Sequence, residues 1–543
     1  MRNFGTHGRV YPEDNYVVPR TEETASFIRR VKDGKYIVLF APRQTGKTTF
    51  FRLALDALTT EDPTYFPIQL DFQIMRNTMP AVFYDRLYQM ICIQIERVFQ
   101  NFGGMPSGAL TQFLENTILT DDFSMMMFFR QLATFLDSRL HKQVQAFKRV
   151  VLLIDEFDGI PRTVMGDFLY ALRQIYLSDK QRCPYSVSIV GVKSIAQLDY
   201  DRSISPFNIQ DEFKLPNFTL EQVDELLSQY TAEVGQAFAP EVIEVLHKQT
   251  AGQPFLVNRF AQILTEELDI PKTETLTIAH FAKAHRQLLT EGNTNIDHLR
   301  TNVRRDLRFE KILMQIASYE SGVPFNPDDA LMNELVTYGV IAADADGMCE
   351  IVNPIYQHRI LQIFKPTFNG LEHTYFSEES SVSFIDYLTP AGQLEMELLL
   401  DNFQEFIARA GFRILQVPNT PREYVGQHLL YAYLDHFIRI VGADMFLEVQ
   451  TGRGRIDLLL LHNQRKYIIE TKIWEGSRYH EAGKKQLAAY MKLEGAVAGY
   501  YVVFDHRQNP EARVETETID GVQIRSYVIP VIQESPSSVS VAR

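Results

Sequence analysis

The chain has 543 residues, 45% of them hydrophobic and 22% charged, which is the composition of a globular rather than a disordered protein. This length exceeds what a single hydrophobic core covers, so about two to four domains are expected. The formal net charge of −14 argues against a protein that simply coats nucleic acid, although a local basic surface stays compatible with it.

The cysteines and the first residues indicate the compartment. Cys92, Cys183 and Cys349 lie far apart and match no zinc-binding spacing, so we expect reduced thiols in the core. The N-terminal stretch lacks the apolar segment of a secretory signal, and no apolar run is long enough to cross a bilayer. These features predict a cytoplasmic protein without a membrane partner.

The first segment, residues 1–215, alternates short apolar runs with amphipathic stretches. Four runs are expected to be buried strands: Tyr36–Phe40, Phe66–Phe72, Val150–Ile154 and Ser186–Val192. Residues 80–100 and 124–140 are expected to be helices, with the Met125–Phe129 run in a helix core. Strands that alternate with helices predict an α/β fold with a parallel sheet.

The remaining segments change character along the chain. Residues 216–299 are expected to form a helical lid, which begins with a capping box of Thr219 and Gln222. Residues 300–366 contain helices and then a hairpin that turns at Asp346–Gly347, a pattern that favours a winged helix. We expect a linker over 367–385, a second α/β domain over 386–534 and a disordered tail over 535–543.

A phosphate-binding loop is predicted directly after the first strand, because a P-loop needs a strand, a tight loop and a helix N-terminus. The lysine would reach the β- and γ-phosphates of ATP, and Thr48 would hold Mg²⁺. Ala41 replaces the usual first glycine with the next smallest residue. The predicted cofactor-binding residues of the loop are Ala41, Arg43, Gln44, Thr45, Gly46, Lys47, Thr48 and Thr49.

Two carboxylates follow the apolar run that ends at Ile154. Asp155 is expected to hold Mg²⁺ and Glu156 to polarise the attacking water, as in a Walker B strand. The alternative is a buried strand with two solvated carboxylates at its end. The P-loop upstream favours the Walker B interpretation.

Together these segments resemble the AAA-like and STAND-like P-loop ATPases over residues 10–366. Further similarities are found in Tyr16–Arg20, Ser205–Ile209, Leu215–Leu220, the lid motif Gly252–Pro254 and Asn353–Tyr356. The resemblance implies ATP binding, with Pro254 beside the nucleotide. Lys193 and Ser194 are sensor candidates, and Arg202 and Arg259 are arginine-finger candidates. The sequence leaves open whether the protein forms a homo-oligomer.

A second constellation lies in the C-terminal segment. Asp457 and Glu470 are expected to face each other across a hairpin that turns near 462–466, with Lys472 on the face of Glu470 and Thr471 pointing away. Two carboxylates and the Thr471 carbonyl would bind Mg²⁺, or Mn²⁺ in its place. The metal would activate water, and Lys472 would offset charge in the transition state.

This pattern resembles the PD-(D/E)XK nuclease superfamily. The resemblance implies a further metal ligand at Glu423 and a helix that carries Gln486 and Tyr490, followed by the strand Gly499–Phe504. Glu448 and Gln450 are weaker candidates for the edge of the site. Residues 453–485 hold eight basic and four acidic side chains, which suits a phosphate track. The alternative is a solvated hairpin with ordinary surface lysines.

The sequence therefore predicts an α/β P-loop ATPase with a helical lid and a winged helix, followed by a separate restriction-endonuclease-like α/β domain. The leading hypothesis is an ATP-regulated, Mg²⁺-dependent nuclease that acts on DNA; the resemblance also suggests defence or mobile-element biology. The alternatives are a nucleotide-switched nucleic-acid-binding protein and an oligomerising signalling ATPase, each with a non-cleaving nuclease-like domain. Four arginines could contact DNA phosphates or form a solvated helix face: Arg300, Arg304, Arg305 and Arg308.

Overall fold

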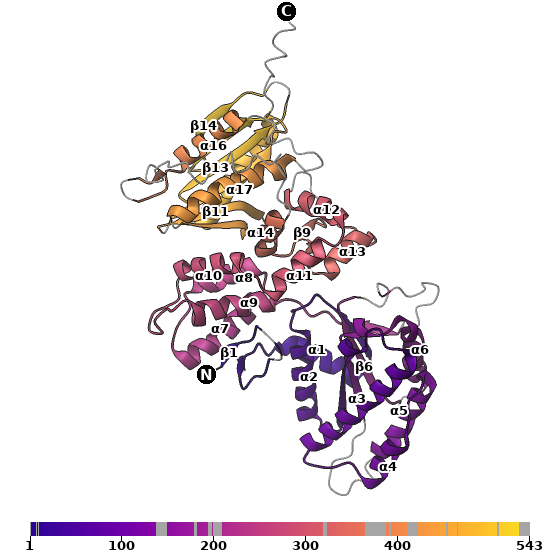
Figure 1. Cartoon of the computed structure of the whole chain (residues 1–543). Coiled ribbons are helices and arrows are strands. Elements are labelled where there is room, and N and C mark those ends of the chain that lie inside the picture. The colour runs from indigo at the N-terminus through magenta and orange to yellow at the C-terminus, as the bar shows by residue number, and fades with distance from the viewer. Residues whose placement is uncertain are drawn as a thin grey trace, which may run out of the picture. The chain divides into compact units, whose positions relative to one another are not determined.

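The computed structural model describes most of the chain in two compact units (Figure 1). The described residues are 2–6, 8, 10–136, 149–178, 182–193, 198, 209–318, 323–363, 387–389, 392–410, 422–441, 443–451, 454–463, 465–507 and 510–531. The first unit comprises Met1–Gly235, Gln253–Gln262 and Thr337–Gly339, and the second comprises Gln236–Gly252, Ile263–Val336 and Val340–Arg543. The predicted linker and tail lie outside the described residues, and the predicted domain boundaries stay predictions.

A five-stranded sheet organises the first unit, and all of its neighbouring strands are parallel, as predicted. Its strand order is β4-β5-β6-β3-β7, with bounds Tyr65–Asp71, Arg149–Asp155, Ser186–Gly191, Tyr36–Phe40 and Gln210–Glu212. The four predicted strands are confirmed to within one residue at each end. β7 was not predicted.

Alternate residues of β3 enter different cores because side chains on a strand point to opposite faces. Tyr36 and Val38 belong to one core, whereas Ile37 and Leu39 belong to the other. Helices α3 (Pro80–Asn101), α4 (Gly108–Asn116), α5 (Asp122–Leu136) and α6 (Arg162–Ser178) supply the first core, and α1 (Thr21–Lys32) and α2 (Lys47–Glu61) supply the second (Figure 1). Helices on both faces explain why β3, β5 and β6 are buried along most of their length.

The rest of the first unit surrounds this sheet. A short parallel pair of strands, β1 (Asn3–Phe4) and β2 (Asn15–Tyr16), precedes it. Helix α7 (Leu220–Val234) begins with the predicted capping box, in which the Gln222 amide donates to Thr219 Oγ1 and the Thr219 amide to Gln222 Oε1, each at 3.2 Å. Helix α9 (Pro254–Gln262) completes the unit.

The second unit begins with helical elements and a small hairpin. The helices are α8 (Pro240–Thr250), the π-helical turn Ile263–Glu267, α10 (Ile278–Thr290), α11 (Thr294–Val303), α12 (Leu307–Ser318), α13 (Ala330–Thr337) and α14 (Pro354–Ile363). Strands β8 (Ile341–Ala343) and β9 (Cys349–Ile351) pair antiparallel, which confirms the predicted hairpin, and Gly347 takes a left-handed φ of 77° in its turn. The assignment as a winged helix stays a prediction.

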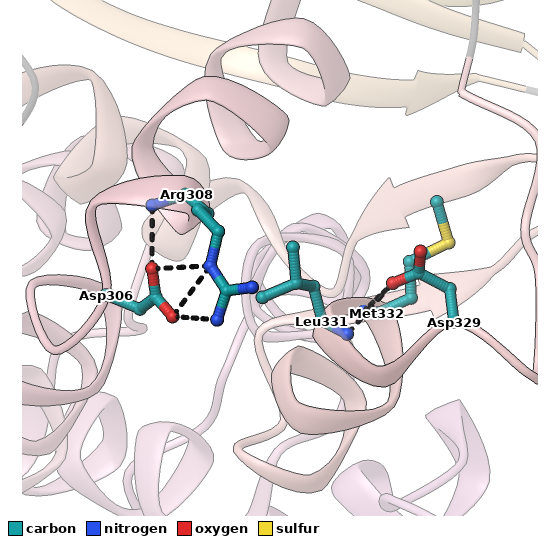
Figure 2. A network of polar contacts seen from close by, with 5 residues as sticks. All are labelled: Asp306, Arg308, Asp329, Leu331 and Met332. Atoms are coloured by element: carbon teal, nitrogen blue, oxygen red, sulfur yellow. Dashed lines mark hydrogen bonds and ion pairs between the residues drawn. The ribbon is translucent and has the colours of Figure 1, made fainter.

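Aspartates cap two of these helices (Figure 2). Asp306 accepts a hydrogen bond from the Arg308 amide at 2.9 Å, and Asp329 accepts bonds from the amides of Leu331 and Met332, both at 2.9 Å. The Arg308 guanidinium also pairs with Asp306, and these hydrogen bonds lower the pKa of that carboxyl to about 2. For Arg308, this engagement favours a solvated helix face over a phosphate contact.

A six-stranded mixed sheet forms the C-terminal part, with strand order β10-β11-β12-β13-β15-β14. The strands are Asp444–Thr451, Gly454–His462, Arg465–Ile473, Ala498–Asp505, Val522–Pro530 and Arg513–Ile519 in that order. The helices are α16 (Met396–Ala410), α17 (Arg422–Val441) and α18 (Ser477–Glu494). The predicted succession of helix, hairpin, helix and strand is therefore present as α17, β11–β12, α18 and β13, and β10 is the strand that precedes the hairpin and carries Glu448 and Gln450.

Candidate functional site

The loop between β3 and α2 has the backbone geometry of a phosphate cradle. Gly46 and Gln44 take left-handed φ values of 81° and 61°, so the chain turns sharply before α2 begins at Lys47. The Ala41 amide donates to the Gly191 carbonyl at 3.1 Å and so extends the pairing of β3 with β6. Ala41 is not among the residues of positive φ, which explains why alanine can replace glycine there.

Lys47 is buried at the start of α2. Its Nζ donates to the carbonyls of Ala41 at 2.8 Å and Pro42 at 2.6 Å. Burial lowers the pKa of Lys47 to about 8, although the nearby carboxylates of Glu156, Asp155 and Asp158 act in the opposite direction. A cation held in this loop beside a helix N-terminus is suited to bind phosphate.

Two carboxylates lie at the end of β5 beside this lysine. The Thr48 hydroxyl donates to Asp155 Oδ2 at 2.6 Å, and the Glu156 amide donates to Asp155 Oδ1 at 2.9 Å. Burial raises the pKa of Glu156, and the neighbouring charge of Asp155 raises it further. The structure thus brings together Lys47, Thr48, Asp155 and Glu156, four residues that the sequence singled out.

Asp158 is a site residue that the sequence analysis missed. Its two carboxylate oxygens accept the amides of Val192 at 2.6 Å and Lys193 at 2.7 Å, which fixes the end of β6 next to β5. Asp158 follows Asp155 by three residues, and this closeness was the feature of the sequence that could have indicated it. Of the sensor and arginine-finger candidates, Lys193 lies here and Arg259 lies on α9, whereas Ser194 and Arg202 lie outside the described residues.

A cavity of about 340 Å³ adjoins the loop and is lined by both polar and apolar side chains. The polar lining includes Lys47, Thr48 and Glu156, and the apolar lining includes Val17, Val18, Phe218 and Leu226. Arg20 stacks on Phe218 at 4.6 Å and donates to the Pro216 carbonyl at 2.6 Å. Such a mixed lining suits a ligand that carries both phosphates and an aromatic base.

The predicted lid motif reaches the same loop. Gln253 Nε2 donates to the Gln44 carbonyl at 3.4 Å, and a Cβ at Gly46 would lie 3.9 Å from the Pro254 side chain. Pro254 also lines the cavity, together with Arg43, Gln44 and Thr49. The cavity is therefore bounded by the loop, the N-terminal segment and α9.

The second constellation forms at one end of the β11–β12 hairpin. The register pairs Leu458 with Ile469, so Asp457 and Glu470 follow as the next facing residues. Lys472 Nζ lies 4.0 Å from Asp457 Oδ2 and 3.9 Å from Glu470 Oε2, and both carboxylates are buried. The hairpin thus brings two acidic side chains and one lysine together, as the sequence predicts.

Thr471 is a correction to the predicted site. Strict strand alternation predicts that its side chain points away, yet its hydroxyl and its amide donate to Asp457 Oδ2 at 2.8 and 2.7 Å. Asp457 leans along the strand toward the next residue of β12, which alternation alone does not anticipate. Thr471 therefore holds one oxygen of Asp457 in place.

Gln486 and Tyr490 come to the same centre from α18. Gln486 Nε2 donates to the Tyr490 hydroxyl at 2.7 Å, which places the two on one helix face. Burial raises the pKa of Tyr490, and the Glu470 carboxylate contributes in the same direction, so the phenol lies near that carboxylate. The side chains of Glu423, Glu448 and Gln450, on α17 and β10, lie outside the description.

The residues of the second centre are compatible with a divalent cation. Among the described residues, no group of three or more histidine, cysteine, aspartate or glutamate side chains could hold a metal. Asp457 and Glu470 nevertheless converge on one ammonium group within 4.0 Å. Because Mg²⁺ commonly takes only one or two carboxylates and completes its shell with water and phosphate oxygens, the pair fits it.

The parallel sheet, the loop and the paired carboxylates define a P-loop nucleoside-triphosphatase domain. A sequence model described as an AAA-like domain matches residues 7–358. The chain therefore belongs to the AAA-like domain family. A second model, a domain of unknown function named DUF8371, matches residues 393–508.

Solved structures offer more distant likenesses. The Walker-type ATPase of Pyrococcus abyssi is 16% identical, with 66% of this chain and 99% of that chain covered and a TM-score of 0.44. RuvB of Thermotoga maritima, a Holliday junction branch migration motor, is 14% identical over 63% of this chain and 93% of its own, with a TM-score of 0.33. Aeropyrum pernix ORC1, solved in complex with DNA, is 15% identical over 64% and 93%, with a TM-score of 0.31.

No curated protein matches the chain. Within the described ranges, none of the helices combines the length and the apolar character needed to span a membrane.

Proposed function

We propose that the protein binds and hydrolyses ATP at the P-loop and cleaves DNA at the second centre, with ATP controlling the cleavage. The observation that carries the proposal is the approach of Lys472 to both Asp457 and Glu470, at 4.0 and 3.9 Å, beside the Gln486–Tyr490 pair. Burying two carboxylates costs free energy that one partly exposed lysine offsets only in part, and clusters of this kind are common at functional sites.

At the P-loop, Lys47 would bind the β- and γ-phosphates, and its pKa of about 8 leaves it mostly protonated at neutral pH. Thr48 and Asp155, already joined by a hydrogen bond of 2.6 Å, would hold Mg²⁺ with the phosphates. Glu156 would orient the attacking water and accept its proton, a role that suits a carboxyl of raised pKa. The apolar side chains that line the cavity would receive the base.

At the second centre, Asp457 and Glu470 would hold Mg²⁺ or Mn²⁺, with the Thr471 carbonyl and Glu423 as further proposed ligands. A metal bound there lowers the pKa of a coordinated water and polarises the phosphodiester. Thr471 fixes Asp457 through its amide and hydroxyl, at 2.7 and 2.8 Å. Lys472 would stabilise charge on the phosphate as it develops, and Gln486 and Tyr490 would position the lysine and Glu470.

The test is cleavage of linear and circular DNA with Mg²⁺ or Mn²⁺, with and without ATP. Lys472→Ala should reduce cleavage about 10²–10³-fold, as expected for a lost charge-stabilising group. Lys47→Ala should leave the centre intact but remove the response to ATP. The matched controls are Lys492→Ala on the exposed end of α18 and Lys35→Ala on the exposed residue before β3, both of which should behave as wild type.

Other outcomes point to the alternatives. If no protein in the series cleaves DNA or RNA, yet nucleic acid binds in an ATP-dependent way, the second centre is a binding module. If ATP raises the molecular mass without any effect on nucleic acid, the chain is an oligomerising ATPase. If Lys472→Ala cleaves DNA as fast as wild type does, the second centre is not the site of cleavage.

A further inference from the structure

Trp474, the only tryptophan of the chain, lies beside the second centre. Its amide donates to the Phe504 carbonyl at 3.0 Å, so the pairing of β12 with β13 continues one residue beyond Ile473. Glu470, Lys472 and Trp474 therefore follow one another on the same face of this strand. Two residues of strand span roughly 6–7 Å, so Trp474 is the next side chain on that face after the lysine.

Two arginines from neighbouring strands lie over the ring of Trp474. Arg507 follows β13 by two residues, and Arg513 is the first residue of β14. Their guanidinium carbons lie 4.7 and 5.3 Å from the centroid of the ring. Cation–π attraction favours both positions, and it holds the two like charges close together on one side chain.

Two buried side chains fix this arrangement. Asp505 is fully buried and accepts hydrogen bonds from Nε and Nη2 of Arg507 at 3.0 and 2.6 Å, which sets the plane of the guanidinium. The ring of His480, also buried, packs against Trp474 with the centroids 5.0 Å apart. Burial lowers the pKa of His480, and nearby cations act in the same direction, so this ring stays neutral at pH 7.

The two guanidiniums nevertheless face solvent, since the side chains of Arg507 and Arg513 are 51% and 44% exposed. Arg513 approaches Glu515 only to 3.6 Å, which is too long for a hydrogen bond. Glu511 acts on Arg507 through its charge. A pair of exposed guanidiniums held close together attracts a further anion, and their donors match the oxygens of a phosphate.

We infer that Arg507 and Arg513, held against Trp474, bind a backbone phosphate of nucleic acid next to the phosphate that reacts at the second centre. The two arginines are binding residues, and Trp474 is a positioning residue that acts through them. The inference rests on the proposed function, because the cleaved DNA strand is the ligand. Phosphate contacts fix the register of a strand without reading its bases, so this site would position DNA of any sequence.

The experiment measures binding of a labelled DNA duplex to the full-length protein by fluorescence anisotropy over a series of salt concentrations. EDTA is present, so that a metal-dependent centre cannot cleave the duplex. The variants are Arg507→Gln, Arg513→Gln and Arg507→Lys, which keeps the charge. The matched control is Lys492→Gln, which removes the same charge at the exposed end of α18. The emission of Trp474 is recorded in each titration and reports on this site alone.

Each arginine-to-glutamine change should raise the Kd about threefold to tenfold and reduce the slope of log K against log salt by about 0.9, the value for one lost phosphate contact. Arg507→Lys and Lys492→Gln should keep the slope of wild type. DNA should change the emission of Trp474 in wild type and in Lys492→Gln. With Mg²⁺, the KM for cleavage should rise in both glutamine variants while kcat stays the same.

Arg507→Gln leaves the buried Asp505 without this partner and so also lowers stability. Arg513→Gln has no such effect, because Glu515 is itself partly exposed, and it therefore decides the test. A purely structural role would lower the melting temperature of the variants and leave the salt slope unchanged.

Three results overturn the inference: no binding of DNA by wild type, binding that leaves the emission of Trp474 unchanged, or a wild-type salt slope in Arg513→Gln. If DNA binds with the expected changes but is never cleaved with Mg²⁺ or Mn²⁺, the phosphate site is supported and the nuclease proposal fails. If DNA is cleaved while slope and emission ignore this site, the nuclease proposal stands and the phosphate site fails.

Discussion

The two centres of this chain are built in different ways. The P-loop occupies one continuous stretch between β3 and α2, and its key features are backbone angles, carbonyls and a helix N-terminus. The second centre joins side chains from β11, β12 and α18, and the register of a hairpin brings them together. The phosphate-binding loop itself is therefore expected to depend less on other elements, whereas Asp155 and Glu156 beside it, and every side chain of the second centre, depend on the packing of the elements that carry them.

The largest effect should come from Glu156→Gln. Loss of the group that accepts the proton of the attacking water should slow ATP hydrolysis about 10²–10⁴-fold. ATP affinity should stay unchanged, because Lys47 and the loop amides are intact. Phosphate release and ATP binding are the measurements, and Asp167→Asn on the exposed face of α6 is the control. Hydrolysis close to wild type would assign the role to another residue.

A pH titration of ATP affinity would test whether the charge of Lys47 contributes to phosphate binding in the P-loop. Lys47 has a pKa lowered to about 8, so it loses its proton as pH rises through 8. Because phosphates bind the protonated form, ATP affinity should fall about tenfold between pH 7 and pH 9 and change little below pH 7. Lys47→Arg, whose side chain stays charged, should lack this fall. Equal pH profiles for the two proteins would contradict the assignment.

A smaller effect is expected at the second centre for Tyr490→Phe. This change removes the hydroxyl that accepts the Gln486 hydrogen bond at 2.7 Å. One lost hydrogen bond should lower cleavage about twofold to tenfold. Tyr479→Phe, on an exposed position of the same helix, is the control and should cleave as wild type does. If Tyr490→Phe cleaves DNA as fast as wild type does, the hydroxyl has no role in cleavage and the ring serves packing alone.

The smallest effect is expected for the capping box at the start of α7. Thr219→Ala removes the side-chain acceptor of the α7 capping box and should lower the stability of that helix by about 1 kcal/mol. Amide hydrogen exchange over Leu220–Val234 measures the loss. Ser228→Ala, at an exposed position of the same helix, should change exchange much less. No difference between the two would mean that tertiary packing alone holds α7.

Much of the fold follows from local patterns. Apolar runs and turn residues located β3–β6 to within one residue, and the spacing around 462–466 gave the correct hairpin. Both depend on interactions between neighbours in the sequence. The role of Asp158 could not be predicted locally because its partners, the amides of Val192 and Lys193, directly follow another strand, β6. The Thr471–Asp457 hydrogen bond was not predicted, because strand alternation gives the face of each side chain in a regular strand but not the direction in which one side chain bends.

The sequence by itself determined the P-loop, the strand that leads into Asp155 and Glu156, the capping box and the hairpin with its two carboxylates. Each depends on residues close together in the chain, where backbone geometry and periodicity act directly. Only the tertiary structure decided which distant residues meet: Arg455 with Glu350, Gly339 with Pro42, and Tyr490 with the centre on β11 and β12. These contacts depend on how helices and sheets pack, and packing is a property of the whole core rather than of any one segment.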